Sequence, residues 1–181
     1  MLEPWKELEQ ERGELLALQP AVRGDVSPAA HVLGVLELGE GSVVLPGTVI
    51  EGHVRIGKRC RIGPNAYLRG ETSIGDDCVV GNAVEVKSSL LGNHVFVSHL
   101  TYVGDSIIRD DVNVGGGCIF SNFRHDAGEI RMPWLGELRQ TGCNKLGCVV
   151  GSHSRIGCKC VILPGRVLPE GTWTEPGTVV R

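Results

Sequence analysis

Residues 50–86 read "IEGHVRIGKRCRIGPNAYLRGETSIGDDCVVGNAVEV", and an aliphatic residue returns in this stretch every six positions. A helix repeats its apolar face every 3.6 residues and a half-buried strand every two, so neither template fits. The register extends along most of the chain and is shortened by one residue before Leu91 and again before Ile108. Its aliphatic positions are Val32, Leu38, Val44, Ile50, Ile56, Ile62, Leu68, Ile74, Val80, Val86, Leu91, Val97, Val103, Ile108, Val114, Phe120, Val150, Ile156, Ile162 and Leu168.

A second set of positions, four residues after the aliphatic ones, holds small or β-branched residues such as Ser42, Thr48 and Ala66, and glycine often follows the aliphatic residue directly. Two inward positions per six residues predict a solenoid of short parallel strands, with three hexads forming one triangular coil. The pattern resembles the hexapeptide-repeat family, which implies an all-β fold, the left-handed parallel β-helix.

The repeat is absent from two parts of the chain. Residues 1–24 are predicted to contain an amphipathic helix over residues 1–20, with Pro4 in its first turn, and part of a lead-in that spans residues 20–31. We expect this helix to cap the exposed end of the solenoid. Residues 25–181 are predicted to form the β-helix domain, interrupted by an excursion at 121–144. Long excursions from a strict solenoid commonly have a binding or assembly role.

Composition excludes several classes of function. The formal net charge is −3 and no run of like charge occurs, which argues against a nucleic-acid partner. No stretch is apolar enough for a membrane span or a signal sequence, so we expect a cytoplasmic protein. The seven cysteines contain no C-x-x-C pair, and four of them fall on the small inward position, where cysteine acts as a buried hydrophobe. These four are Cys60, Cys78, Cys118 and Cys160, whereas Cys143, Cys148 and Cys158 stay unassigned.

Two cations are predicted to stack on one edge of the solenoid. Arg69 and Lys87 each follow a repeat aliphatic and are eighteen residues apart, so they should lie about 4.8 Å apart in adjacent coils. At an effective dielectric constant of about 20 their repulsion is about 3 kcal/mol, which is relieved if both side chains turn into water or if an anion such as phosphate bridges them. In the next coil Gly104 takes this position and should leave the edge open.

A histidine is predicted to face outward close to these cations. His99 should stack above Asn82, and Tyr102 above Glu85 in the adjacent coil. An imidazole with a carboxylate beside an anion site has the parts of a general base. His94 has no distinctive residue predicted to stack with it.

Four short motifs carry a more specific resemblance. The segments "GNAVEVK", "HLTYVGD", "VNVGGG" followed by "SN", and "TGCNKLG" are similar to the acetyltransferase half of bifunctional glucosamine-1-phosphate acetyltransferase/N-acetylglucosamine-1-phosphate uridyltransferase, and the last motif to its archaeal branch. The resemblance implies acetyl-CoA as co-substrate, an amino sugar phosphate or nucleotide sugar as acceptor, and a homotrimer. We expect no uridyltransferase domain in this sequence.

The same resemblance assigns roles position by position. His99 would be the general base, Glu85 would help to orient it, and Asn122 would position the substrate or polarise the thioester carbonyl. The residues that would contact the sugar and its phosphate are Arg69, Lys87, Tyr102, Asn113 and Lys145. Those expected near the coenzyme are Cys158, Arg166 and Arg181. The chain departs from the family pattern at Phe123, where the family has tyrosine, and at Arg124 and His125.

Two other functions stay open at this point. One is a non-catalytic trimer that binds sugar phosphates or nucleotide sugars beside a separate nucleotidyltransferase chain. The other is a zinc enzyme like the γ-carbonic anhydrases, using His94 and His99. The zinc hypothesis lacks a third histidine at a matching coil, and catalytic zinc needs three protein ligands.

Overall fold

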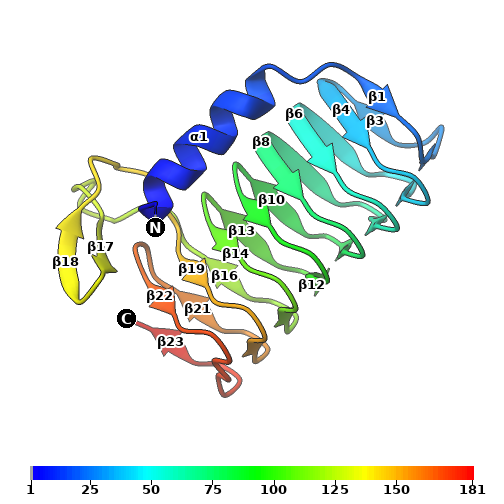
Figure 1. Cartoon of the computed structure of the whole chain (residues 1–181). Helices are drawn as coiled ribbons and strands as arrows, with labels where there is room; N and C mark the ends of the chain where they lie inside the picture. Colours follow the sequence, from blue (N-terminus) through cyan, green and yellow to red (C-terminus); the bar gives the residue numbers. More distant parts are fainter. Residues whose placement is uncertain (1) are drawn as a thin grey trace.

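The computed structural model describes residues 2–181, which form a left-handed parallel β-helix with three faces (Figure 1). One face is a sheet of β2 (Asp25–Val26), β5 (Val43–Val44), β7 (Arg61–Ile62), β9 (Val79–Asn82), β12 (Phe96–His99), β15 (Asn113–Val114) and β20 (Arg155–Ile156). The larger sheet contains β1 (Ala21–Val22), β3 (His31–Val32), β4 (Val35–Leu38), β6 (Val49–Ile56), β8 (Tyr67–Ile74), β10 (Glu85–Lys87), β11 (Leu90–Leu91), β13 (Tyr102–Gly104), β14 (Ile107–Ile108), β16 (Ile119–Phe120), β19 (Val149–Val150), β21 (Val161–Ile162), β22 (Val167–Leu168) and β23 (Val179–Val180). Because β8 pairs with both β10 and β11, this sheet bends around a corner and forms the other two faces.

Strand pairing follows the predicted six-residue register. Val97 lies beside Val80 and Val114 in the neighbouring coils, although both steps are seventeen residues long. The inward aliphatic residues fill one continuous core, and this confirms the fold class predicted from the repeat. Pairing begins at Ala21, so residues 21–31, expected as a lead-in, already form strands of the solenoid. The reason is that Val26 continues the hexad one step before Val32 and packs against the core.

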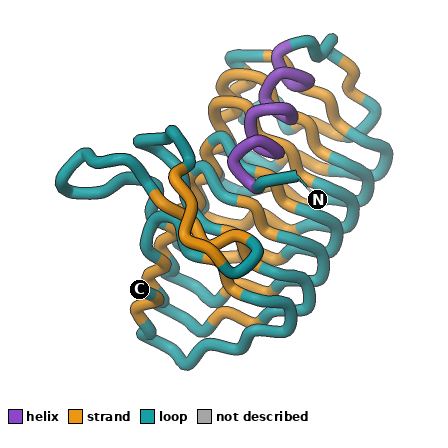
Figure 2. Tube along the Cα trace, turned by 60° about the vertical axis from the view of Figure 1, so that its left-hand side comes forward, coloured by secondary structure: helices purple, strands orange, loops and turns teal. Residues whose placement is uncertain are grey.

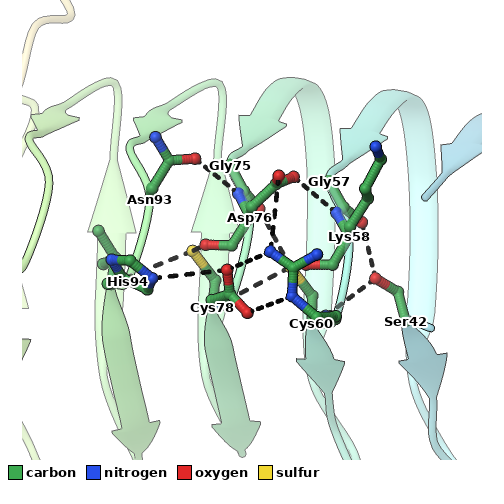
Figure 3. A network of polar contacts seen from close by, with 12 residues as sticks. Ser42, Gly57, Lys58, Cys60, Gly75, Asp76, Cys78, Asn93 and His94 are labelled. Carbon is green, nitrogen blue, oxygen red and sulfur yellow. Dashed lines mark hydrogen bonds and ion pairs between the residues drawn. The ribbon is translucent and has the colours of Figure 1, made fainter. Parts of the chain in front are cut away.

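The four cysteines on the small inward position are buried, as predicted. The backbone N–H of Cys60 donates to Ser42 Oγ (2.9 Å), and the N–H of Cys78 donates to Cys60 Sγ (3.4 Å), so these side chains form a ladder along one corner (Figure 3). Burial raises the pKa of Cys118 to about 11. The Cys118 thiol therefore stays protonated at neutral pH and serves as a packing group.

The helix α1 (Pro4–Leu16) lies along the side of the coils rather than over the end of the solenoid, so the expected end cap is wrong (Figures 1 and 2). Its apolar residues Trp5 and Leu8 pack against Ile107 and Val149, which face outward from the coils. A bidentate ion pair between Glu7 and Arg109 (2.6 and 2.7 Å) adds to this contact. Among residues 2–181 no helix is both long and apolar enough to cross a membrane.

The excursion contains an antiparallel hairpin of β17 (Arg131–Trp134) and β18 (Glu137–Gln140). It leaves the side of the solenoid next to the start of α1 (Figure 2). Ile130 and Met132 are buried in the same cluster as Trp5 and Leu8. The hairpin and the helix therefore share one apolar core outside the solenoid.

Candidate functional site

The two predicted cations are neighbours, and each has its own carboxylate. Lys87 pairs with Arg69 in the register of β10 and β8. Arg69 Nε donates to Glu85 Oε1 (2.7 Å), and Lys87 Nζ donates to Asp105 Oδ2 (2.7 Å). The repulsion expected between them is therefore offset by carboxylates of the protein itself, an arrangement that we had not predicted.

Asp105 lies at the centre of this arrangement and is only 3% exposed. Its carboxylate also accepts hydrogen bonds from Arg12 Nη2 (2.5 Å), which comes from α1, and from Asn122 Nδ2. Asp105 and Arg12 are not among the site residues predicted from the sequence. Asp105 could have been found, because it follows Gly104 in the "YVGD" motif, whereas the position of Arg12 depends on how the helix docks.

Tyr102 fills the edge that Gly104 was expected to leave open. Tyr102 lies beside Glu85 in the register, as predicted. Its phenol ring crosses Gly104 so closely that a Cβ on that glycine would lie 2.7 Å from Tyr102 Cζ. Burial and the nearby charges of Asp105 and Glu85 raise the pKa of Tyr102, so its hydroxyl is a neutral hydrogen-bond group.

His99 is exposed at the end of β12, beside Asn82, as predicted. It lies on the seven-stranded sheet, and the corner at Leu100 (φ +50°) separates it from Tyr102 on the larger sheet. Glu85 is bound to Arg69, and within residues 2–181 no hydrogen bond joins it to the His99 imidazole. Glu85 therefore has Arg69 as its hydrogen-bond partner in this structure, and a role of Glu85 in orienting His99 stays a prediction.

The position beside His99 in the next coil holds a glycine. A Cβ on Gly116 would lie 3.4 Å from His99 Cβ, so the corner next to the imidazole carries no side chain at this coil. The Lys159 N–H donates to the Gly116 carbonyl. Cys158 therefore lies at the same corner in the next coil. Cys158 is exposed. Of the residues expected near the coenzyme, Cys158 thus shares a column with His99.

The other predicted residues are distributed more widely. Asn113 lies beside Phe96 on the seven-stranded sheet and lines a shallow hollow with His94 and Arg155. The remaining three belong to later parts of the chain. Lys145 is exposed and forms an isolated β-bridge with Phe123 at the base of the excursion. Arg166 lines a cavity under the excursion. Arg181 follows β23 at the end of the chain.

His94 belongs to a separate column of charged corner residues. Its Nε2 lies 3.5 Å from Asp77 Oδ2 and its Nδ1 lies 3.2 Å from Asp111 Oδ1, and Asp77 also pairs with Arg59. Within the described chain, no group of three or more His, Cys, Asp or Glu side chains is arranged to hold a metal ion. The contacts of His94 are those of an alternating surface charge ladder.

Together these features define a hexapeptide-repeat protein with an exposed histidine at a coil corner and a network of paired charges on the adjoining face. The chain belongs to the family described as the GMPPB C-terminal domain, whose sequence model matches residues 44–176.

Similar proteins include enzymes with two activities. A bifunctional sugar-1-phosphate nucleotidylyltransferase/acetyltransferase from Sulfurisphaera tokodaii is 40% identical over 101 residues, covering 56% of this chain and 25% of that protein. The bifunctional protein GlmU from Methanococcus aeolicus is 29% identical over 178 residues, covering 98% of this chain and 43% of that protein. The chain therefore spans less than half the length of these relatives, and the matches confirm the resemblance stated from the sequence motifs.

A solved structure gives a more distant likeness. It is a mutant of perosamine N-acetyltransferase from Caulobacter crescentus in complex with CoA and GDP-perosamine. It has a TM-score of 0.42 and 23% sequence identity to this chain, and the alignment covers 65% of this chain and 57% of the other.

Proposed function

We propose that this chain transfers an acetyl group from acetyl-CoA to the amine of an amino sugar 1-phosphate or of the corresponding nucleotide sugar. The observation that carries the proposal is the exposed His99 imidazole, next to a corner that Gly116 leaves without a side chain. The relative from Sulfurisphaera tokodaii, which is named a nucleotidylyltransferase/acetyltransferase and aligns with 56% of the chain, supports the reaction class.

In this proposal His99 acts as the general base. An amino sugar is an ammonium ion at neutral pH, and imidazole titrates in the range needed to accept its proton. The freed amine adds to the thioester carbonyl carbon that bound acetyl-CoA supplies; the C–S bond breaks, and the thiolate takes up a proton. In the same proposal Tyr102 contacts the sugar and its phosphate, and Asn122 positions the substrate or polarises the thioester carbonyl; their common position at the Asp105 network supports this.

The remaining assignments are part of the same proposal. Glu85 helps to orient His99, and it also holds the guanidinium of Arg69, which serves the acceptor. Lys87, Asn113 and Lys145 serve the acceptor, whereas Cys158, Arg166 and Arg181 serve the coenzyme.

We further propose that the active unit is a homotrimer in the cytoplasm. Three apolar side chains near His99 are 38–65% exposed, namely Phe96, Leu100 and Ile119. A second copy packed against this corner would bury them and enclose the imidazole. Seven free thiols favour a reducing compartment.

The test is replacement of the base. His99→Ala should lower the release of CoA thiol in the presence of glucosamine 1-phosphate by about 100-fold or more, the usual contribution of a general base. His31→Ala is the matched control, because His31 lies in β3 at the far end of the solenoid. Unchanged turnover in His99→Ala would remove His99 from the mechanism.

A non-catalytic function is the second candidate, and it is favoured by the positions of Arg166 and Arg181, which were expected near the coenzyme but lie on other parts of the fold than Cys158. In this case the chain is a trimer that binds sugar phosphates or nucleotide sugars and partners a separate nucleotidyltransferase. Titration calorimetry with acetyl-CoA separates the two functions, since a binding partner of this kind has no site for the coenzyme.

A further inference from the structure

A cavity of about 420 Å³ lies between the excursion and the turn that follows β21. Phe123, Arg131 and Leu138 line it from the excursion, and Pro164 and Arg166 line it from the turn. Ser121, which also lines it, continues the column of Lys87 and Gly104, because Phe120 pairs with Val103. The cavity therefore begins about two coil rises, roughly 10 Å, from Lys87.

The walls of this cavity are held in place. Ile130 is buried in the cluster with Trp5, and its carbonyl accepts a hydrogen bond from Thr141 Oγ1 (2.6 Å). Gly165 has φ +72°, and a Cβ there would lie 2.8 Å from the Ile130 side chain. Only glycine allows the turn to approach the hairpin this closely. The cavity is thus preformed, as binding sites for small molecules usually are.

The charges inside the cavity are not balanced. Arg124 is bound at the rim by both oxygens of Asp126 (2.8 and 2.5 Å). Arg131 and Arg166 form no ion pair with any residue in the described range 2–181, and Arg166 Nε is buried without a hydrogen-bond partner. A buried donor without an acceptor is costly, and a guanidinium is well suited to an oxyanion with two acceptor oxygens. His125 also lines the cavity.

We propose that this cavity binds the phosphate group of an organic phosphate, with Arg131 and Arg166 as its donors. Phe123, Leu138 and Pro164 supply an apolar wall for the organic part of the ligand. The source of that phosphate, either the sugar acceptor or the coenzyme, rests on the proposed function. Binding of phosphate itself depends only on the cavity.

Calorimetry with inorganic pyrophosphate tests the site directly. The wild-type chain should bind it, and Arg166→Met and Arg131→Met should each weaken binding about tenfold or more, since each removes a charge-assisted contact. The matched control is Arg139→Met, on the same hairpin but paired with Glu3 and Glu137. Binding to Arg139→Met should stay within about twofold of wild type. Unchanged thermal unfolding midpoints would show that the variants are folded.

Either of two results of this titration would overturn the proposal. One is a wild-type chain that does not bind pyrophosphate. The other is a loss of binding in Lys87→Met together with unchanged binding in Arg166→Met, which would place the anion on the Arg69–Lys87 column.

Competition identifies the source of the phosphate. Displacement of pyrophosphate by CoA but more weakly by dephospho-CoA assigns the cavity to the coenzyme, and displacement by glucosamine 1-phosphate assigns it to the acceptor. Displacement by neither class contradicts the proposal. If acetyl transfer is intact but pyrophosphate does not bind, only this inference fails. If pyrophosphate binds but His99→Ala does not affect transfer, only the proposed role of His99 fails.

Discussion

Two basic regions of this protein have similar charged residues and different surroundings. The column on the larger sheet carries Arg69 and Lys87, and the protein neutralises both with Glu85 and Asp105. The cavity under the excursion carries Arg131 and Arg166, for which residues 2–181 provide no ion-pair partner. The comparison shows that stacked cations in a solenoid do not by themselves indicate an anion site. The decisive feature is whether a nearby carboxylate already occupies the donors.

The largest effect is expected from removing the carboxylate at the centre of the column. Asp105→Ala leaves Lys87 and Arg12 without their partner in a mostly buried setting, and it should destabilise the fold by about 3 kcal/mol. Urea unfolding measures this change. The matched substitution at the cavity, Asp126→Ala, removes an exposed carboxylate and should have a much smaller effect. Equal effects at the two positions would remove the distinction between the regions.

A smaller effect is expected where Tyr102 closes the column. Gly104→Ala places a methyl group against the phenol ring, and moving the ring should cost about 2 kcal/mol in the free energy of unfolding. Gly116→Ala is the control, because its new methyl group meets His99 Cβ at 3.4 Å and needs little adjustment. If Gly104→Ala did not change the free energy of unfolding, the Tyr102 ring would be able to move away from residue 104. The column would then be open to a ligand.

The smallest effect concerns the pKa of Asp126 at the rim of the cavity. The Arg124 guanidinium, helped by the Gly128 N–H, holds the pKa of this carboxyl well below its ordinary value of 3.8. A folded-state pKa below the unfolded one means that the pair stabilises the fold above pH 3.8 and that this contribution is lost as pH falls through the lowered value. In Arg124→Met the pKa should return toward 3.8, as measured by NMR titration. An unchanged low pKa would show that Asp126 also neutralises Arg131 or Arg166. This would contradict the difference between the two basic regions.

The repeat could be predicted residue by residue from the sequence, because the solenoid core depends on local spacing. Counting in sixes predicts that Leu68 lies beside Val86 and that Cys78 is buried. With the hexad shortened before Leu91, it also predicts that Val86 lies beside Val103. Register also placed Arg69 beside Lys87. It could not show that the Asp105 side chain, at a corner with φ +45°, is directed toward Lys87.

The six-residue repeat could not predict the contacts between the solenoid and the segments outside it. The docking of α1 depends on Trp5 and Leu8 finding apolar residues that face outward from later coils, and this contact brings Arg12 to Asp105. The cavity similarly depends on the path of the excursion, in which Arg124, Arg131 and Arg139 follow one another without a fixed period. Only the structure shows that Arg139 is paired with acids and that Arg131 faces the cavity.

A crystal structure of the wild-type protein with pyrophosphate tests the central comparison most directly. We expect diphosphate density between the guanidinium groups of Arg131 and Arg166, with the Arg69–Glu85 and Lys87–Asp105 pairs intact. A diphosphate that bridges Arg69 and Lys87, with both of those pairs broken, would contradict this expectation.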